Sequence, residues 1–317
     1  MSSVCVTGAT GFVGSNVAQV LMDFGYDVIA LTRSEPSVAM PWEYRVVDTY
    51  DPEAVAQAAR GASAIVHTAI ANDFQRLDPS AAYRAYPGLT QSITRAAMSI
   101  GAKPVYISTD WVMDGAGHKV TEDSIGRPIN TYGYLKALGE QVIRDLAPGV
   151  GATCRIGGVM GRNRLVQASP RSQDVGFGYF VSSLVDTVRS GQEFAVFSGH
   201  GVNLTATPSL AAEIGATIAR IVDRDAEGVF HVVSDDATDR WDLALLTAEV
   251  FDLEPRLITQ VEPGADDRFA QPVPIDTSLD NARLKKELGI GPVSVRDMLE
   301  HLKAEEDGAL HPVTTSL

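Results

Sequence analysis

Short apolar runs alternate with segments of helical periodicity through the first half of the chain. The apolar runs predict strands at 3–6, 26–32, 44–47, 64–67, 104–108 and 152–156. Between them, apolar residues recur three and four positions apart, and this spacing predicts helices after the first strand and over about 52–60, 78–100 and 132–146. Such alternation is typical of an α/β fold of the Rossmann type, in which helices cover both faces of a doubly wound parallel sheet.

The pattern loosens after about residue 157. Helices are expected at about 179–190, 210–222 and 241–251, together with short strands such as 229–233. We therefore expect a Rossmann domain at 1–157, to which later segments can return, and a smaller α+β substrate lobe at 158–310. The last residues, 311–317, are expected to be a disordered tail.

Three glycines stand between the first predicted strand and the first predicted helix, at Gly8, Gly11 and Gly14. Free backbone N–H groups and the helix dipole at such a junction favour a pyrophosphate, and the missing side chains allow close approach. The spacing alone also fits an ordinary turn. The second strand at 26–32 completes a βαβ unit, however, and this context favours a dinucleotide site.

The end of the second strand bears on the choice of cofactor. An acid that binds the adenine ribose is expected about 20 residues after the glycines, but the chain reads Arg33-Ser34-Glu35. Arg33 and Ser34 suit a 2′-phosphate, so we prefer NADP(H). NAD(H) stays open, because Glu35 can reach a hydroxyl and Arg33 is also compatible with a solvated surface position.

Composition and charge restrict the partners and the cellular compartment that we expect for this protein. The chain is 45% hydrophobic and carries a net charge of −14, which argues against nucleic acid or an anionic membrane as a partner. No apolar run is long enough to cross a bilayer, and the two cysteines, Cys5 and Cys154, lie in predicted buried strands. We therefore expect a cytoplasmic protein without disulfides, and no Cys or His spacing predicts a metal site.

A candidate catalytic pair lies on the helix predicted at 132–146. Tyr132 and Lys136 are four positions apart and so project from one face. An ammonium near a phenol lowers its pKa, which suits proton transfer to a carbonyl oxygen. Ser108 and Thr109, at a strand end, supply a hydroxyl for the same oxygen. By itself the spacing also fits a core tyrosine and a solvated lysine, and the glycine loop favours catalysis.

Together these motifs resemble the extended short-chain dehydrogenase/reductase superfamily. Within it, the segment YISTDWVMDG at 106–115 is similar to the STDYVFDG segment of the dTDP-4-dehydrorhamnose reductases. The similarity extends over almost the whole chain. It continues at 122–123, 128, 132–133, 136, 139–140, 207–211, 228–231, 241, 270–272 and 278–280.

The resemblance implies that Tyr132 is the proton donor, that Lys136 binds the nicotinamide ribose, and that Thr109 binds the substrate oxygen. With the residues noted above, the expected cofactor contacts are Gly8, Thr10, Gly11, Phe12, Val13, Gly14, Arg33, Ser34, Asp48, Thr49, His67, Thr68, Ala69, Tyr132 and Lys136. The expected substrate contacts are Ser108, Asp110, Trp111, and two arginines of the polar segment 162–177, Arg162 and Arg171.

Three departures from the family pattern concern the substrate. His67-Thr68-Ala69 replaces the usual Asn-Ala-Ala, Trp111 replaces a tyrosine, and the asparagine usually found before Gly88 is absent. In addition, related dehydratases follow the active-site threonine with Asp-Glu, whereas Asp110 here precedes a tryptophan, which disfavours dehydration.

The sequence thus predicts an NADP(H)-dependent reductase of a sugar carbonyl, with a nucleotide-activated 4-keto-deoxysugar as the preferred substrate. An epimerase and a reductase of simple aldehydes or ketones remain alternatives. So does a non-catalytic role, because the regulatory beta subunit of methionine adenosyltransferase resembles this subfamily. The expected partner is a small sugar or nucleotide sugar, and a homodimer is compatible with the sequence.

Overall fold

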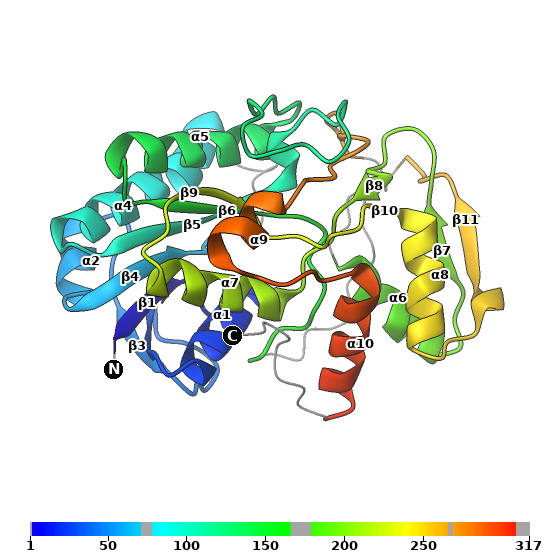
Figure 1. Cartoon of the computed structure of the whole chain (residues 1–317), viewed down its shortest axis with the longest axis horizontal. Helices are drawn as coiled ribbons and strands as arrows, with labels where there is room; N and C mark the ends of the chain where they lie inside the picture. The colour runs from blue at the N-terminus through cyan, green and yellow to red at the C-terminus, as the bar shows by residue number, and fades with distance from the viewer. Residues whose placement is uncertain (1, 71–77, 166–178, 266–268, 309–317) are drawn as a thin grey trace.

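A parallel sheet of seven strands forms the larger part of the molecule (Figure 1). The computed structural model describes residues 2–70, 78–165, 179–265 and 269–308. The strands lie in the order β3-β2-β1-β4-β5-β6-β9, and every neighbouring pair is parallel. Their bounds are β1 Ser3–Thr7, β2 Asp27–Thr32, β3 Glu43–Val46, β4 Ala62–His67, β5 Lys103–Thr109, β6 Ala152–Ile156 and β9 Gly228–His231.

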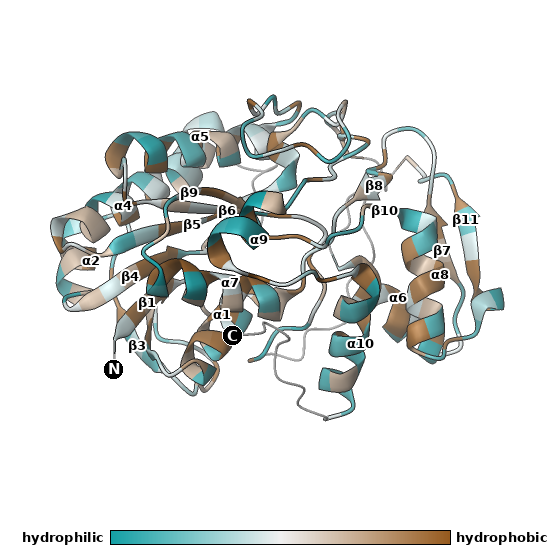
Figure 2. Ribbon diagram, viewed as in Figure 1, coloured by the Kyte–Doolittle hydropathy of each residue, from teal (hydrophilic) through white to brown (hydrophobic). Residues whose placement is uncertain are grey.

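Helices cover both faces of this sheet, because alternate residues of its strands are apolar on both sides. On β1, Val4 and Val6 belong to one apolar core, while Cys5 belongs to another on the opposite face. The first core is covered by α1 (Phe12–Asp23), α7 (Ala211–Asp223) and α9 (Ala282–Leu288), and the second by α2 (Pro52–Ala58) and α4 (Leu89–Ser99). A further helix, α5 (Thr131–Leu146), packs against α4 and β5. Figure 2 shows the strands between these helices as largely hydrophobic. The predicted α/β, Rossmann-type class is confirmed.

One predicted helix, 78–100, is divided in the structure. It consists of α3 (Pro79–Tyr83), a π-helical turn at Arg84–Gly88, and α4. Pro87 lies inside the π turn, where it has no N–H to donate and where its ring conflicts with an ordinary α-helical hydrogen bond. The wider turn accommodates the proline, so the chain continues in the same direction without a break.

A smaller lobe packs beside the carboxyl ends of the strands (Figure 1). Its core joins α6 (Phe180–Arg189), α8 (Arg240–Val250) and α10 (Val295–Glu306). Two short sheets complete it. They are the parallel pair β7 (Phe194–Phe197) and β11 (Ile258–Val261), and the antiparallel pair β8 (Thr205–Ala206) and β10 (Thr238–Asp239).

The strand predicted at 229–233 does not belong to this lobe. As β9 it pairs with β6 and becomes the seventh strand of the main sheet. Phe230 is fully buried in the same core as α7, which explains the placement, because this apolar residue needs a covered sheet face. The chain therefore returns to the Rossmann sheet after building part of the lobe.

Neither a membrane-spanning helix nor a metal-binding cluster occurs in the described part of the chain. No helix there is long and apolar enough to cross a membrane. No group of three or more His, Cys, Asp or Glu side chains among the same residues is arranged to hold a metal ion.

Candidate active site

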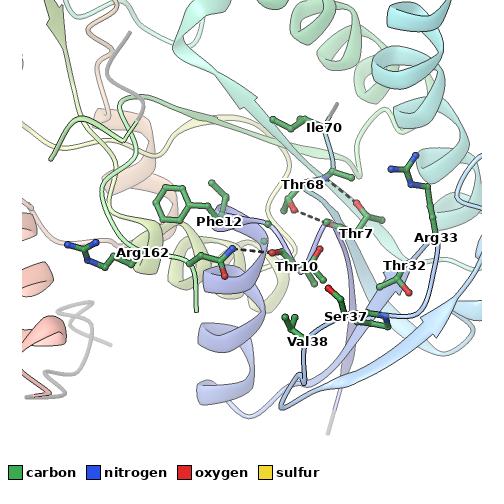
Figure 3. Close-up of a pocket in the computed structure, with 18 of the residues that line it drawn as sticks. Thr7, Thr10, Phe12, Thr32, Arg33, Ser37, Val38, Thr68, Ile70 and Arg162 are labelled. Carbon is green, nitrogen blue, oxygen red and sulfur yellow. Dashed lines mark hydrogen bonds between the residues drawn. The ribbon is translucent and has the colours of Figure 1, made fainter. Parts of the chain in front are cut away.

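A long groove crosses the carboxyl ends of β1, β2 and β4 and reaches α6 of the lobe. It has a volume of about 1320 Å³. The glycine loop lies at its centre, with Arg33 on one side and Arg162 on the other (Figure 3). Tyr179, Ser182 and Arg189 line its end at the lobe. The groove thus lies where open α/β sheets bind their ligands, beyond the ends of the strands.

The glycine loop has the geometry of a phosphate cradle. Gly8 has a φ of +72°, which favours glycine, and its carbonyl accepts the N–H of Gly11 at 2.9 Å. A Cβ on Gly14 would overlap the Gly8 carbonyl oxygen, and one on Gly8 would lie 2.8 Å from the nitrogen of Ala69. The following helix, α1, has no side-chain cap, so its first N–H groups face the groove and are suited to an anion. A dinucleotide pyrophosphate fits these features.

The groove offers a cation where the adenine ribose of a dinucleotide is expected. Arg33 and Ser34 are exposed and line the groove just after β2. Neither makes an ion pair or side-chain hydrogen bond with a described residue. By contrast, Glu35 accepts a hydrogen bond of 2.6 Å from the hydroxyl of Tyr44. Because the acid is engaged and the guanidinium is available, this end of the groove suits a 2′-phosphate better than a free 2′-hydroxyl.

The two residues expected near adenine differ in their placement. Thr49 is buried and lines the groove beside Tyr50. Asp48 is exposed, but its carboxylate accepts the backbone N–H of Tyr50 at 3.0 Å. Asp48 therefore shapes the turn that presents Thr49 and Tyr50.

The three residues expected to contact the cofactor at the end of β4 also differ in their placement. Thr68 and Ala69 line the groove, and the Thr68 hydroxyl donates to the Thr7 carbonyl at 2.7 Å. His67 is only 4% exposed and its Nδ1 lies 2.8 Å from the Thr7 hydroxyl. Burial, and then the charge of Lys136, lower the pKa of His67 to about 3, so the imidazole is neutral. Its side chain supports the floor of the groove, and a direct cofactor contact, as expected from the sequence, is not supported.

Tyr132 of α5 and Thr109 of β5 both contact Trp111, just after the end of β5. Thr109 ends this strand, and its Oγ1 accepts the backbone N–H of Trp111 at 3.3 Å. The indole of Trp111 packs edge-on against the ring of Tyr132, with centroids 6.1 Å apart. Tyr86 contacts the same tyrosine ring at 6.5 Å. Tyr132 is thus half-buried, with aromatic rings on two sides.

Lys136 lies one helical turn further on, in the interior. It is 3% exposed, and its ammonium donates to the carbonyl of Ile107 and lies 4.5 Å from the ring centroid of Tyr106. Burial lowers the pKa of Lys136 to about 7, and the charge of Glu140 opposes this change. Neither Tyr106 nor Glu140 is among the site residues expected from the sequence. The spacing does contain a signal for Glu140, because it lies four positions after Lys136 and so projects from the same face of the helix.

Ser108 and Asp110 do not face the groove. The Ser108 hydroxyl is 1% exposed and donates to Glu140 Oε1 at 2.6 Å. Asp110 is 4% exposed and accepts the hydroxyl of Thr109 at 3.0 Å, and burial raises its pKa to about 6. Because strand residues alternate between the faces of a sheet, Ser108 projects into the helix-covered interior. The expected substrate contacts of both residues are therefore not supported, and Asp110 instead contacts Thr109.

Arg162 lines the groove, but carboxylates already hold its guanidinium. Its Nε donates to Glu306 at 2.6 Å, and its two terminal nitrogens donate to Asp186 at 2.7 and 3.0 Å. These bonds, Asp186 foremost, raise the pKa of Arg162 above its ordinary value. An incoming substrate phosphate would have to displace them. The second arginine expected there, Arg171, lies outside the described residues, as does the segment 311–317.

Comparisons with known proteins agree with this geometry. The family described as RmlD substrate binding domain matches residues 1–307. A dTDP-4-keto-6-deoxy-D-glucose reductase from Streptomyces niveus is 28% identical over 269 residues, which cover 84% of this chain and 83% of that protein. Methionine adenosyltransferase 2 subunit beta from Rattus norvegicus is 26% identical over 297 residues, or 91% and 83% of the two chains. Among solved structures, dTDP-4-dehydrorhamnose reductase from Bacillus anthracis in complex with NADP has a TM-score of 0.77. Its sequence identity is 20%, over 96% of this chain and all of that one.

Proposed function

The chain belongs to the RmlD substrate binding domain family, and on this premise we propose that it is an NADP(H)-dependent reductase of a nucleotide-activated 4-keto-6-deoxysugar. It is an oxidoreductase of the short-chain dehydrogenase/reductase type. The observation that carries the proposal is a groove built for a dinucleotide beyond the strand ends, with Thr109 at the end of the neighbouring strand β5. Tyr132 contacts Trp111, whose backbone N–H donates to Thr109, and Lys136 donates to the carbonyl of Ile107 on the same strand. The Streptomyces niveus relative, named as a reductase of such a sugar, supports the substrate class.

Three side chains perform the proton chemistry in this proposal. NADPH, when bound, supplies a hydride to the carbonyl carbon. Tyr132 gives its phenolic proton to the carbonyl oxygen, which leaves an alcohol and a phenolate. The ammonium of Lys136 stabilises that phenolate, since an opposite charge nearby favours the ionised form. Thr109 holds the carbonyl oxygen in line. Its hydroxyl can rotate from Asp110 towards the substrate because a hydroxyl turns freely about its C–O bond.

The groove supports NADP(H) as the cofactor. Gly8, Gly11 and Gly14 would hold the pyrophosphate together with the backbone of Thr10, Phe12 and Val13. Arg33 and Ser34 would bind the 2′-phosphate. On the substrate side, Trp111 lies against Tyr132 and so would contact the sugar. Arg162 could bind its diphosphate only by exchanging partners with Asp186 or Glu306.

We propose that the cofactor-binding unit is larger than residues 1–157. β9 extends the main sheet and α7 packs against α1, so both would belong to this unit. The substrate lobe would then comprise the remaining segments of 158–310, centred on the core of α6, α8 and α10.

A substrate panel tests the proposed reaction. NADPH oxidation is measured with dTDP- and UDP-linked 4-keto-6-deoxysugars, the corresponding free sugars and simple ketones. Turnover with a nucleotide-linked ketosugar, and loss of it in Tyr132→Phe and Lys136→Met, is the expected result. Tyr134→Phe is the matched control, because Tyr134 lies on the same helix and is 61% exposed. Equal turnover of the free and the nucleotide-linked sugars would remove the nucleotide from the proposal.

A second candidate is a binding role within a larger enzyme, which the similarity to a methionine adenosyltransferase subunit favours. A pull-down that recovers a stoichiometric partner, together with no NADPH oxidation on any member of the panel, would select this alternative. Turnover by the isolated protein would instead select the reductase.

A further inference from the structure

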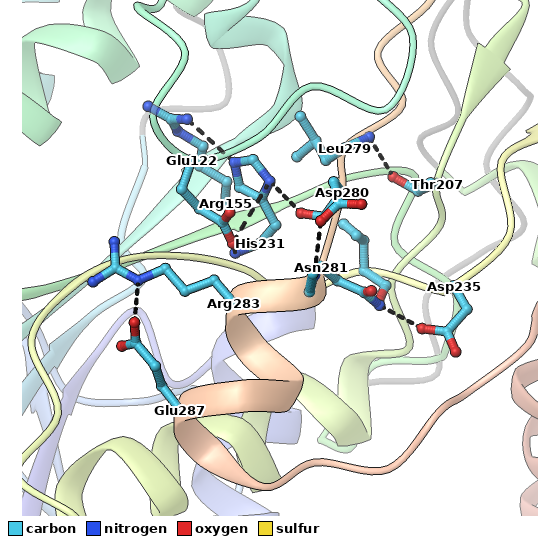
Figure 4. Close-up of polar contacts among 12 residues, drawn as sticks. Glu122, Arg155, Thr207, His231, Asp235, Leu279, Asp280, Asn281, Arg283 and Glu287 are labelled. Atoms are coloured by element: carbon cyan, nitrogen blue, oxygen red, sulfur yellow. Dashed lines mark hydrogen bonds and ion pairs between the residues drawn. The ribbon is translucent and has the colours of Figure 1, made fainter.

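A row of polar side chains crosses the main sheet underneath the catalytic helix. Ser108 on β5 is in register with Arg155 on β6, and Arg155 is in register with His231 on β9. Residues in register on adjacent parallel strands project from the same face. All three are buried, with exposures of 1%, 4% and 0%. Figure 4 shows Arg155 and His231 together in this row.

Glu140 of α5 receives the hydrogen bonds of this row. Its Oε1 accepts the Ser108 hydroxyl at 2.6 Å and the Nε of Arg155 at 2.9 Å, and its Oε2 accepts Arg155 Nη2 at 2.8 Å. The two charged side chains are each 5% exposed. A forked pair of this kind fixes the carboxylate in one orientation. Glu140 is therefore a buried negative charge in a set position.

The far side of Arg155 meets a neutral group. Its Nη1 lies 3.2 Å from Nε2 of His231, whose Nδ1 lies 2.8 Å from the carbonyl of Asp280 (Figure 4). Burial, followed by the charge of Arg155, lowers the pKa of His231 to about 3. The neutral ring can accept from Arg155 and donate to Asp280. Glu122 also approaches His231, through the histidine backbone N–H at 3.3 Å. Among the described residues, Glu140 is thus the carboxylate paired directly with Arg155.

This fixed carboxylate lies on the same face of α5 as Lys136. Lys136 and Glu140 are four positions apart on α5 and both are buried. On the strand below, Lys136 binds the carbonyl of Ile107, while Glu140 binds the side chain of the next residue, Ser108. We propose that Glu140 is a positioning residue for catalysis, whose carboxylate keeps Lys136 in the ammonium form that Tyr132 requires. This inference rests on the proposed reductase function.

The electrostatic surroundings of Lys136 support this assignment. Desolvation lowers its pKa to about 7, and the charge of Glu140 opposes that effect. Two other titratable groups among the described residues interact with the lysine, and neither carries a negative charge near neutral pH. His67 on β4 is neutral, with a pKa near 3, and burial raises the pKa of Tyr106 on β5 well above its ordinary value. Tyr132, on the same helix, transfers the proton. Glu140 is consequently the anion on which the charge of Lys136 depends.

The pKa of Lys136 can be measured without any turnover. The protein is labelled with ¹³C at lysine Cε, the Lys136 signal is assigned by its absence in Lys136→Met, and its shift is followed against pH. In Glu140→Gln the titration midpoint is expected to fall by about one to two pH units, the effect of one buried unit charge at a helical i, i+4 separation. Asp145→Asn is the matched control, because it removes an exposed carboxylate from the same helix.

Two further variants separate charge from structure. Ser108→Ala removes a hydrogen bond to Glu140 but keeps the charge, so the midpoint should stay within about 0.3 pH units, well below the shift from losing a whole charge. Glu140→Met/Arg155→Met replaces the buried pair by apolar groups of similar size, a change that proteins often tolerate. It provides a folded variant if Arg155 without its partner destabilises Glu140→Gln. A lowered midpoint is expected there too, since the charge of Glu140 raises the pKa of Lys136.

The titration distinguishes failure of the Glu140 assignment from failure of the proposed reductase function. A wild-type midpoint in a folded variant that lacks Glu140 would overturn the assignment, whether or not the protein reduces a sugar. If the midpoint falls but no carbonyl is reduced, the electrostatic role stands and the reductase proposal fails. If the electrostatic role and the reductase function both hold, kcat/KM for reduction should depend on pH in the same way. In Glu140→Gln, the alkaline limb of the profile should move to lower pH by the same shift, and in Ser108→Ala it should stay in place.

Discussion

Replacing Arg33 with serine tests how the groove selects between NADPH and NADH. Arg33 lines the groove at the end of β2, is exposed, and makes no ion pair with a described residue, while the neighbouring Glu35 is bonded to Tyr44. Removing the guanidinium should weaken NADPH binding because a 2′-phosphate loses its charged partner. NADH binding should change little, since a 2′-hydroxyl makes no such pair.

The size of the effect follows from the exposure of this site. A hydrogen bond between charged groups contributes about 1.5–3 kcal/mol. The lower end applies to Arg33, because water screens charges at an exposed position. A loss of about 1.5 kcal/mol corresponds to slightly more than a tenfold increase in Kd. The difference should shrink further as salt is added, since ions screen exposed charges.

The assay is equilibrium binding of NADPH and of NADH, followed by the quenching of protein fluorescence, at low and high salt. Arg60→Ser is the matched control, since Arg60 is exposed and lies outside the lining of the groove. The Kd for NADH divided by the Kd for NADPH should fall about tenfold in Arg33→Ser, the equivalent of one exposed charged hydrogen bond. An unchanged ratio would refute the assignment of Arg33 to the 2′-phosphate.

Two further predictions concern the glycine loop and the buried histidines. A Cβ on Gly14 would overlap backbone, so Gly14→Ala should lower the unfolding free energy by about 1–3 kcal/mol, measured in urea. Gly11→Ala meets only a contact of 3.2 Å and should fold normally yet lose NADPH, and equal stabilities would contradict this contrast. The folded-state pKa values of His67 and His231 are about 3, against 6.5 when unfolded, so only the unfolded chain binds these protons between the two values. Stability should therefore fall as pH drops below about 6.5, by about 2 kcal/mol per histidine at pH 5. A urea midpoint independent of pH over this range would disprove it.

The sequence predicted most of the main sheet, because its strands are buried on both faces and read as continuous apolar runs. It predicted the strand at 229–233 but not its pairing with β6 in the main sheet, since an apolar run indicates burial without indicating which sheet provides it. The division of the helix at 78–100 had a visible cause in Pro87, but the π turn that accommodates it depends on packing. Local pattern thus determined the type of these elements and not their partners.

The residues of the candidate site were also predictable only in part. The glycines, Thr109, Tyr132 and Lys136 carry recognisable spacing. The structure places the glycines in the groove, and it places Thr109 and Tyr132 against Trp111 after the end of β5. The orientation of side chains at the strand ends was not predictable, because a one-residue step along a strand turns a side chain from the groove to the interior. Ser108 therefore bonds to buried Glu140 and not to a ligand.

In the proposed reaction, Tyr132 protonates a sugar carbonyl as NADPH is oxidised. The most direct measurement compares the wild type with Tyr132→Phe in single-turnover reduction of a nucleotide-linked 4-keto-6-deoxysugar, after NADPH binding by both has been confirmed. Loss of a general acid is expected to lower the rate by about 10²–10⁴-fold with NADPH affinity retained. A rate in Tyr132→Phe within about threefold of wild type would contradict the role of Tyr132 as proton donor, because a general acid contributes far more than this.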